Sequence, residues 1–119
     1  MTEPFVEIVD IESLDRFLTK SNNGPVIILK HSDSCGVSSR AYAEMGKLQH
    51  PVGLITVQKA RAVSDRLEER LGVAHETPQV LIVRDGKLIW TTSHLQVRVD
   101  AVEAALEEVG RRQQAEGSR

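Results

Sequence analysis

The residues with the clearest chemical potential lie in one stretch, from Pro25 to Ser39, around Cys35, the only cysteine of the chain. Cys35 follows an aliphatic run and a short polar turn, and a helical pattern begins just after it. At a helix start, unpaired backbone N–H groups and the helix dipole stabilise a thiolate. A lone cysteine is more often a small buried hydrophobe. Because its neighbours Ser34, Gly36 and Ser38 are small and polar, we expect Cys35 to be a reactive nucleophile.

A single cysteine also constrains the reaction that this site can carry out. Ser38 stands where the second thiol of a C-x-x-C pair would be, and a serine hydroxyl forms no disulfide. A soluble thiol must then resolve any mixed disulfide formed on Cys35. Gly36, Val37 and Ser38 are candidate supporting residues. Ser38 either donates a hydrogen bond to the thiolate or caps backbone N–H groups of the helix, and the sequence does not separate these roles.

A second chemical signal is the pair Thr77-Pro78, which immediately precedes a buried strand pattern. Proline at this position suits a cis peptide bond, which would turn the Thr77 backbone toward a bound peptide or thiol. The alternative is an ordinary trans proline that opens a strand. With a reactive cysteine elsewhere in the chain, we expect the cis bond, and we take Thr77 and Pro78 as candidate binding residues.

The elements that must position these residues follow from hydrophobic periodicity. Five strands are predicted, at Phe5–Val9, Val26–Leu29, Gly53–Val57, Val80–Val83 and Lys87–Thr91. Four helices are predicted: after Asp10 or Ser13 to Leu18, from Cys35 to about 49–51, through Val63–Leu71, and through Val99–Val109. The order is β-α-β-α-β-α-β-β-α, with an Asp85-Gly86 hairpin turn joining the last two strands. With a cysteine after the second strand, this order describes a thioredoxin-like α/β fold, a mixed central sheet flanked by helices on both faces.

Length and composition favour a single domain, residues 1–119, with an ordered core at about 5–109 and a polar tail at 110–119. A formal charge of −2 gives no electrostatic case for nucleic acid. No apolar run is long enough to span a membrane, and the acidic start at Met1–Pro4 is unlike a signal peptide. We therefore expect a cytoplasmic protein.

The chain has four histidines, His31, His50, His75 and His94. They lack metal-ligand spacing, so we expect no bound metal ion.

Several of these residues together resemble a known family, the YtxJ-like monothiol bacilliredoxins. The resemblance covers about Phe5 to Val109, and its motifs are His31-Ser32-x-x-Cys35-x-x-Ser38-Ser39, Glu76-Thr77-Pro78-Gln79-Val80, Asp85-Gly86 and Trp90-x-Thr92-Ser93-His94. It implies a thioredoxin fold, a redox-active Cys35 and a cis bond before Pro78. It also implies removal of the thiol bacillithiol from modified protein cysteines, with bacillithiol as co-substrate and no tightly bound cofactor. The implied partners are bacillithiolated proteins and a flavin-dependent bacillithiol disulfide reductase.

Two other readings remain open. Cys35-Gly36-Val37-Ser38 is one residue from the Cys-Gly-Phe-Ser motif of monothiol glutaredoxins, some of which use glutathione to share a [2Fe–2S] cluster. However, the Gly-Gly segment that binds glutathione in those proteins is missing. A thioredoxin-like interaction module with an incidental cysteine is the third reading. The bacilliredoxin family usually has proline where this chain has Gly36. This departure bears on the rate and on the pKa of the thiol, and we expect the nucleophile to be retained.

Charged and titratable residues near the motifs complete the candidate site. His31 and His94 could raise the local positive potential or contact a ligand. Alternatively, His31 ends a strand and His94 is a loop residue packed on Trp90. Lys30 and Lys59 are expected to be solvated charges.

Overall fold

The structure of the protein, a computed structural model, describes residues 4–34 and 36–117. Its elements are β1 (Phe5–Glu7), α1 (Ile11–Thr19), η1 (Lys20–Asn23), β2 (Val26–His31), α2 (Gly36–Met45), β3 (Val52–Thr56), α3 (Arg61–Leu71), β4 (Gln79–Arg84), β5 (Lys87–Ser93), η2 (His94–Gln96) and α4 (Val99–Gly117). The predicted order of strands and helices is confirmed.

The five strands form one mixed sheet in the order β1-β3-β2-β4-β5. β1, β3 and β2 are parallel, whereas β4 runs antiparallel to β2 and β5 antiparallel to β4. β2 lies at the centre, as its run of aliphatic residues predicts. Lys30 pairs with Gln79. The start of β4 therefore lies at the same end of the sheet as the residues that lead into Cys35.

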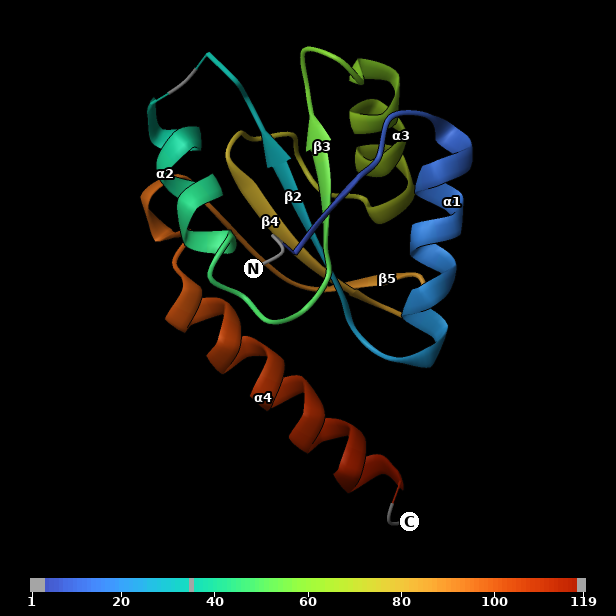
Figure 1. Ribbon diagram of the computed structural model, residues 1–119. Helices are drawn as coiled ribbons and strands as arrows, with labels where there is room; N and C mark the ends of the chain where they lie inside the picture. Colours follow the sequence, from blue (N-terminus) through green and yellow to red (C-terminus); the bar gives the residue numbers. More distant parts are fainter. Residues whose placement is uncertain (1–3, 35, 118–119) are drawn as a thin grey trace.

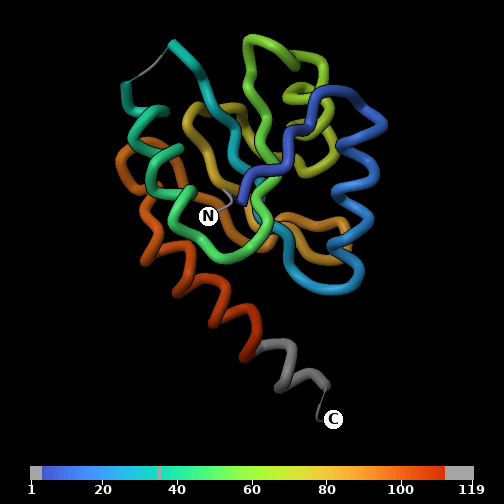
Figure 2. The backbone as a smooth tube through the Cα atoms, in the orientation of Figure 1, coloured from blue at the N-terminus to red at the C-terminus, as the bar shows by residue number. Residues whose placement is uncertain are grey.

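Helices cover both faces of this sheet, with α2 and α4 on one side and α1 and α3 on the other (Figure 1; the same path is drawn as a tube in Figure 2). Each face has its own buried core. The core on the α2 and α4 side contains Ile27, Leu29, Ala41, Met45, Val80, Ile82 and Val102. The core on the α1 and α3 side contains Leu14, Phe17, Ile28, Ile55, Val63, Leu67 and Leu81. The alternation along β2 is the period-2 pattern of a strand buried on both faces.

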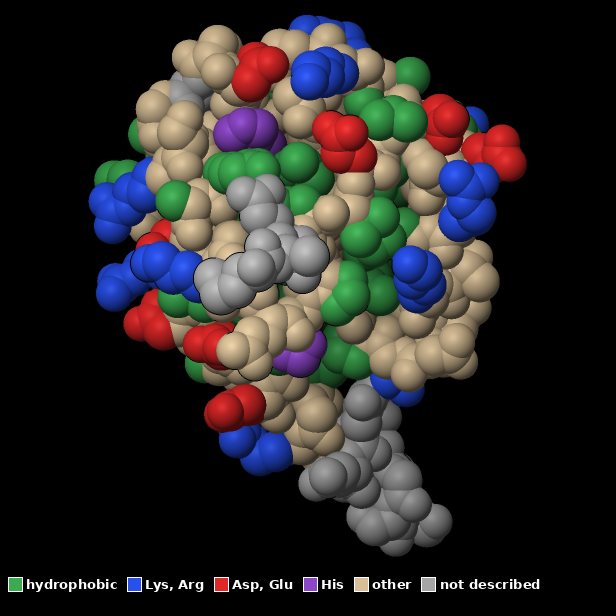
Figure 3. All heavy atoms as spheres, in the orientation of Figure 1, with side chains coloured by type: hydrophobic (Ala, Val, Ile, Leu, Met, Phe, Trp, Pro, Cys, Tyr) green, Lys and Arg blue, Asp and Glu red, His purple; other side chains and the backbone are tan. Residues whose placement is uncertain are grey.

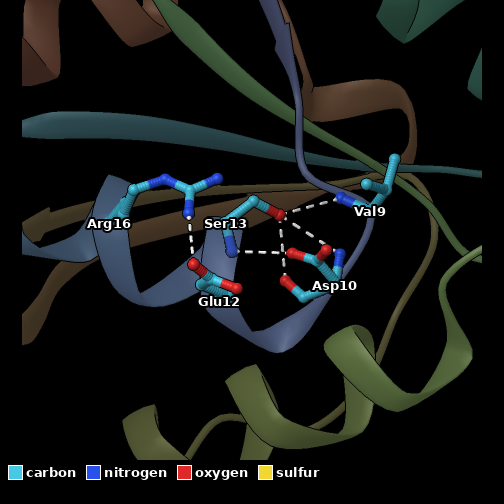
Figure 4. Close-up of polar contacts among 5 residues, drawn as sticks. All are labelled: Val9, Asp10, Glu12, Ser13 and Arg16. Carbon is cyan, nitrogen blue, oxygen red and sulfur yellow. Dashed lines mark hydrogen bonds and ion pairs between the residues drawn. The ribbon is translucent and has the colours of Figure 1, made fainter.

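Helix α1 begins at a capping box. The Asp10 carboxylate accepts a hydrogen bond from the Ser13 N–H at 2.7 Å, and the Ser13 hydroxyl accepts one from the Asp10 N–H at 3.1 Å (Figure 4). Both residues named as possible caps therefore contribute, with Asp10 at the N-cap position. The hairpin turn is also as predicted, since Asp85 and Gly86 both have positive φ, at 53° and 73°.

The structure corrects three predicted boundaries. β1 ends at Glu7, and α2 ends at Met45, where the Gly46 and Leu48 N–H groups make turn hydrogen bonds to Tyr42 and Met45. α4 continues to Gly117, whereas the sequence predicted a frayed tail from Gly110 (Figure 1). A single helical glycine costs roughly 1 kcal/mol relative to alanine, which is too little to end a helix.

The surface carries charges of both signs. On the face drawn in Figure 3, basic and acidic side chains are interspersed, with hydrophobic side chains between them. Within the described part of the chain, no helix is both long and apolar enough to cross a membrane.

Candidate active site

The site is built where β2 ends and α2 begins. β2 runs to His31, residues 32–34 form a short loop, and α2 starts at Gly36. Cys35 immediately precedes α2 in the chain, and the predictions about its own exposure and thiolate lie outside the described residues. Gly36 is exposed, and a Cβ added there would meet no atom within 4 Å. Val37 is half-buried and Ser38 is fully buried.

Ser38 holds the loop that leads into the cysteine. Its hydroxyl accepts a hydrogen bond from the Ser32 N–H at 3.2 Å. This bond differs from the predicted capping of the helix, because the N–H group belongs to the preceding loop and not to the first turn of α2. The predicted bond to the thiolate involves Cys35 and lies outside the described residues.

Gln58 holds the same loop from the other side, and sequence reasoning did not single it out. Its Nε2 donates to the Ser32 hydroxyl at 2.7 Å and to the Ser34 hydroxyl at 3.1 Å. Its Oε1 accepts from the Asp33 N–H at 3.3 Å. One carboxamide thus contacts all three residues that precede Cys35. The available signal was topological, because the loops after neighbouring parallel strands meet at one edge of a sheet.

His31 ends β2 and packs beside Tyr42, with the ring centroids 5.2 Å apart. Its Nδ1 is buried and has no hydrogen-bond partner among the described residues. Burial lowers the pKa of the imidazole from its ordinary value of 6.5. The lowered pKa opposes a positive charge on His31. Its place at the strand end agrees with the structural alternative, and its contact with a ligand stays a prediction.

The buried imidazole makes stability depend on pH. Because the pKa of His31 is lower in the folded than in the unfolded chain, unfolded chains bind more protons as the pH falls below 6.5. We expect the stability of the wild type to decline relative to His31→Phe between about pH 7.5 and pH 5.5. Thermal melts at several pH values test this, with His50→Phe, at an exposed histidine, as control. A melting temperature of the wild type that does not fall relative to that of His31→Phe on acidification would contradict it.

The Thr77–Pro78 peptide bond is cis, as expected from its position before β4. Pro78 is buried and Thr77 is half-buried. The Pro78 carbonyl accepts a hydrogen bond from the His94 N–H at 2.9 Å. The structure therefore brings the segments around Thr77 and His94 together, at the end of the sheet where β2 leads into Cys35.

The His94 side chain is exposed, and its backbone is left-handed, with φ 57°. Nδ1 lies 3.1 Å from the Ser93 hydroxyl and 3.9 Å from a Glu76 carboxylate oxygen. Glu76 directly precedes Thr77, so backbone and side chain of His94 both contact the cis-proline segment. Contact between this exposed imidazole and a ligand stays a prediction.

Lys30 is not a solvated charge, which corrects the sequence prediction. Its side chain is only 1% exposed, and its Nζ lies 2.7 Å from His75 Nδ1. Burial lowers the pKa of Lys30, while Glu68 and Asp65 oppose that change. Lys59 is exposed, as predicted. Across the residues that the structure describes, no group of three or more His, Cys, Asp and Glu side chains could hold a metal ion.

Comparison with known proteins decides the family. The family model for the monothiol bacilliredoxin BrxC matches residues 6–102, most of the chain. The chain belongs to the BrxC monothiol bacilliredoxin family. The resemblance to this family read from the sequence is confirmed.

Solved structures similar to this BrxC-family chain have the thioredoxin fold. A thioredoxin-fold protein described provisionally as an oxidoreductase is 26% identical, with a TM-score of 0.78 over 85% of this chain and 92% of that one. A point mutant of thioredoxin from Halobacterium salinarum NRC-1 is 18% identical, with a TM-score of 0.69 over 92% and 95%. Fasciola hepatica thioredoxin is 9% identical, with a TM-score of 0.71 over 87% and 97%. The predicted fold class is confirmed, and family and fold together support a thiol oxidoreductase-like function.

Proposed function

We propose that this protein removes bacillithiol from mixed disulfides on protein cysteines, with Cys35 as the single nucleophile. The observation that carries this proposal is the match to the monothiol bacilliredoxin family over residues 6–102 in a chain with one cysteine. The geometry agrees with it. The loop before Cys35 and the segment around Pro78 lie at the same end of the sheet.

The reaction proceeds by two thiol–disulfide exchanges. The Cys35 thiolate attacks the bacillithiol sulfur of the mixed disulfide, the substrate's S–S bond breaks, and the protein thiolate leaves and takes a proton from solvent. A free bacillithiol thiolate then attacks the bacillithiol sulfur on Cys35 and releases bacillithiol disulfide and the Cys35 thiolate. The bacillithiol disulfide returns to two thiols by accepting two electrons from a flavin-dependent reductase.

The surrounding residues have supporting roles in this proposal. Gly36 and Val37 begin α2 beside the nucleophile, and Ser38 fixes the loop before it through the Ser32 N–H. The backbone at Thr77 and Pro78 binds the disulfide substrate. His94 contacts the thiol ligand from the exposed side of that segment. His31 lines the α2 side of the site, where its ring packs beside Tyr42.

We further propose that the protein works in the cytoplasm, where a bacillithiol pool and its reductase supply the second exchange. It needs no tightly bound cofactor, since both exchanges use only thiol and disulfide sulfur.

A monothiol glutaredoxin-like function is the second candidate, favoured by Cys35-Gly36-Val37-Ser38. Against it, Asp85-Gly86 forms a tight hairpin turn at the end of β4 remote from Pro78, where it cannot replace the missing glutathione-binding Gly-Gly segment. An absorbing iron–sulfur species on purification would favour this candidate.

Intact-protein mass spectrometry in a single turnover tests the proposed function. Mixed with a bacillithiolated model protein and no free thiol, the wild type should gain the mass of one bacillithiol, located on Cys35 by peptide mapping. Added bacillithiol should then clear this adduct. An unmodified protein after prolonged incubation would refute the proposal.

A further inference from the structure

Lys30 is a buried charge that the proposed chemistry does not use. It occupies the β2 position two residues after Ile28, on the face covered by α1 and α3, and it is 1% exposed. Lysine is almost never fully buried unless it is paired, because removing an ammonium group from water is costly. Its burial therefore needs a reason beyond filling the core.

The partner of Lys30 is His75, which comes from the segment between α3 and β4. Lys30 Nζ lies 2.7 Å from His75 Nδ1, and the Ser64 hydroxyl lies 3.3 Å from the same nitrogen. An ammonium group can only donate, so His75 Nδ1 is the acceptor in this contact. Asp65 and Glu68 of α3 favour the charged form of Lys30 electrostatically.

The segment that carries His75 depends on side chains for its position. Among the described residues, 74–77 make no backbone–backbone hydrogen bond to the rest of the fold. The hydrogen bonds that fix this stretch are those of His75 and one from Gln79 Nε2 to the Ala74 carbonyl, at 3.2 Å. Gln79 is 1% exposed, and its Oε1 has no partner within the described structure. Gln79 pairs with Lys30 across β2 and β4. The two side chains that hold residues 74–77 therefore come from neighbouring positions of the sheet.

We infer that Lys30 is a positioning residue that, through His75, holds residues 74–77 and thereby places Thr77 and Pro78 against the loop that precedes Cys35. Lys30 lies five residues before Cys35 in the chain, and His75 lies three residues before Pro78. Their contact therefore joins the segment that leads into Cys35 to the segment that leads into Pro78. This inference rests on the proposed function for its catalytic consequence. Its structural part stands independently.

A purely stabilising role predicts a different result from a positioning role. Replacing a buried charge with an apolar side chain of similar volume is often neutral or stabilising. Lys30→Met should therefore fold with an unchanged or higher melting temperature while its function declines. A structural role alone would lower both together.

The test compares Lys30→Met and His75→Leu, which each remove the contact, with His75→Asn, which can keep an acceptor near the position of Nδ1. Lys59→Met, at an exposed lysine, is the matched control. Three measurements are made on each variant. They are hydrogen–deuterium exchange of the His94 amide, which donates to the Pro78 carbonyl at the end of this segment, alkylation of Cys35 by iodoacetamide, and kcat and KM for bacillithiol removal from a bacillithiolated model protein.

We expect Lys30→Met and His75→Leu to speed exchange of the His94 amide about tenfold and to raise KM about tenfold, with the double variant no worse than either single variant. Iodoacetamide does not depend on binding at the cis-proline segment, so it should alkylate Cys35 in these variants at the wild-type rate. His75→Asn and Lys59→Met should resemble the wild type.

Three results would overturn the inference: unchanged exchange of the His94 amide in both variants, alkylation slowed as much as turnover, or His75→Asn behaving like His75→Leu. If the wild type removes no bacillithiol, the proposed function fails, while the exchange data still decide whether the Lys30–His75 contact holds the segment.

Discussion

Replacing Cys35 with serine should abolish thiol transfer, with a loss of at least about a thousandfold in kcat/KM. The chain has no other thiol, and a serine hydroxyl neither ionises near neutral pH nor forms a disulfide. Serine is nearly isosteric with cysteine, so the fold should be retained. Release of the free thiol from a bacillithiolated model protein measures the effect, and circular dichroism checks the fold.

The matched control restores a thiol at a different place. In the double variant Cys35→Ser, Glu69→Cys, one thiol stands at an exposed position of α3. It should remain as inactive as Cys35→Ser, because it lacks the loop and the cis-proline segment that surround Cys35. Transfer at the wild-type rate by this double variant would show that any exposed thiol suffices, and the site described here would not be the active site.

Gly53→Ala should destabilise the protein by about 1–3 kcal/mol, as overpacking in a core does. Gly53 lies in β3, between β1 and β2, under the side chains of α1. A Cβ there would lie 2.7 Å from Ile8 Cδ1 and 2.8 Å from Phe17 Cε2. The end of Ile8 can move, but the Phe17 ring is fixed by packing against the sheet. Chemical denaturation gives the change in the free energy of unfolding.

Gly110→Ala is the control for the same substitution in open space. A Cβ at Gly110 would meet nothing within 4 Å, and Gly110 lies inside helix α4. Alanine should therefore stabilise the protein there, by about 0.5–1 kcal/mol. If Gly53→Ala changed the free energy of unfolding in the same direction and by the same amount as Gly110→Ala, the side chains around Gly53 would have to move aside without cost.

The fold could be predicted because its pattern is local. The aliphatic run of β2, the Asp10 capping box and the Asp85-Gly86 turn each specify their structure within a few residues. Alternating strands and helices then leave few topologies. The error at α4 arose because Gly110 was read as a helix end, whereas the polar residues that follow it continue the helix.

The site could be predicted only in part, because its supporting contacts are not local. Cys35 and Thr77-Pro78 carry signals in their own neighbours. Lys30 follows Ile28 by two positions in the strand, so its side chain lies on the same buried face of the sheet. Its charge nevertheless led to the prediction of a solvent-exposed side chain. Its partner His75 comes from 45 residues further along the chain. Gln58 likewise acts on a loop more than 20 residues before it.

The most direct test of the central claim compares two thiols on the same substrate cysteine. A model protein carrying either bacillithiol or glutathione in a mixed disulfide is mixed with the wild type, and release of the protein thiol is followed under identical conditions, each with its own free thiol. The account predicts faster removal of bacillithiol than of glutathione. Faster removal of glutathione would contradict it and would make this protein a glutaredoxin in function.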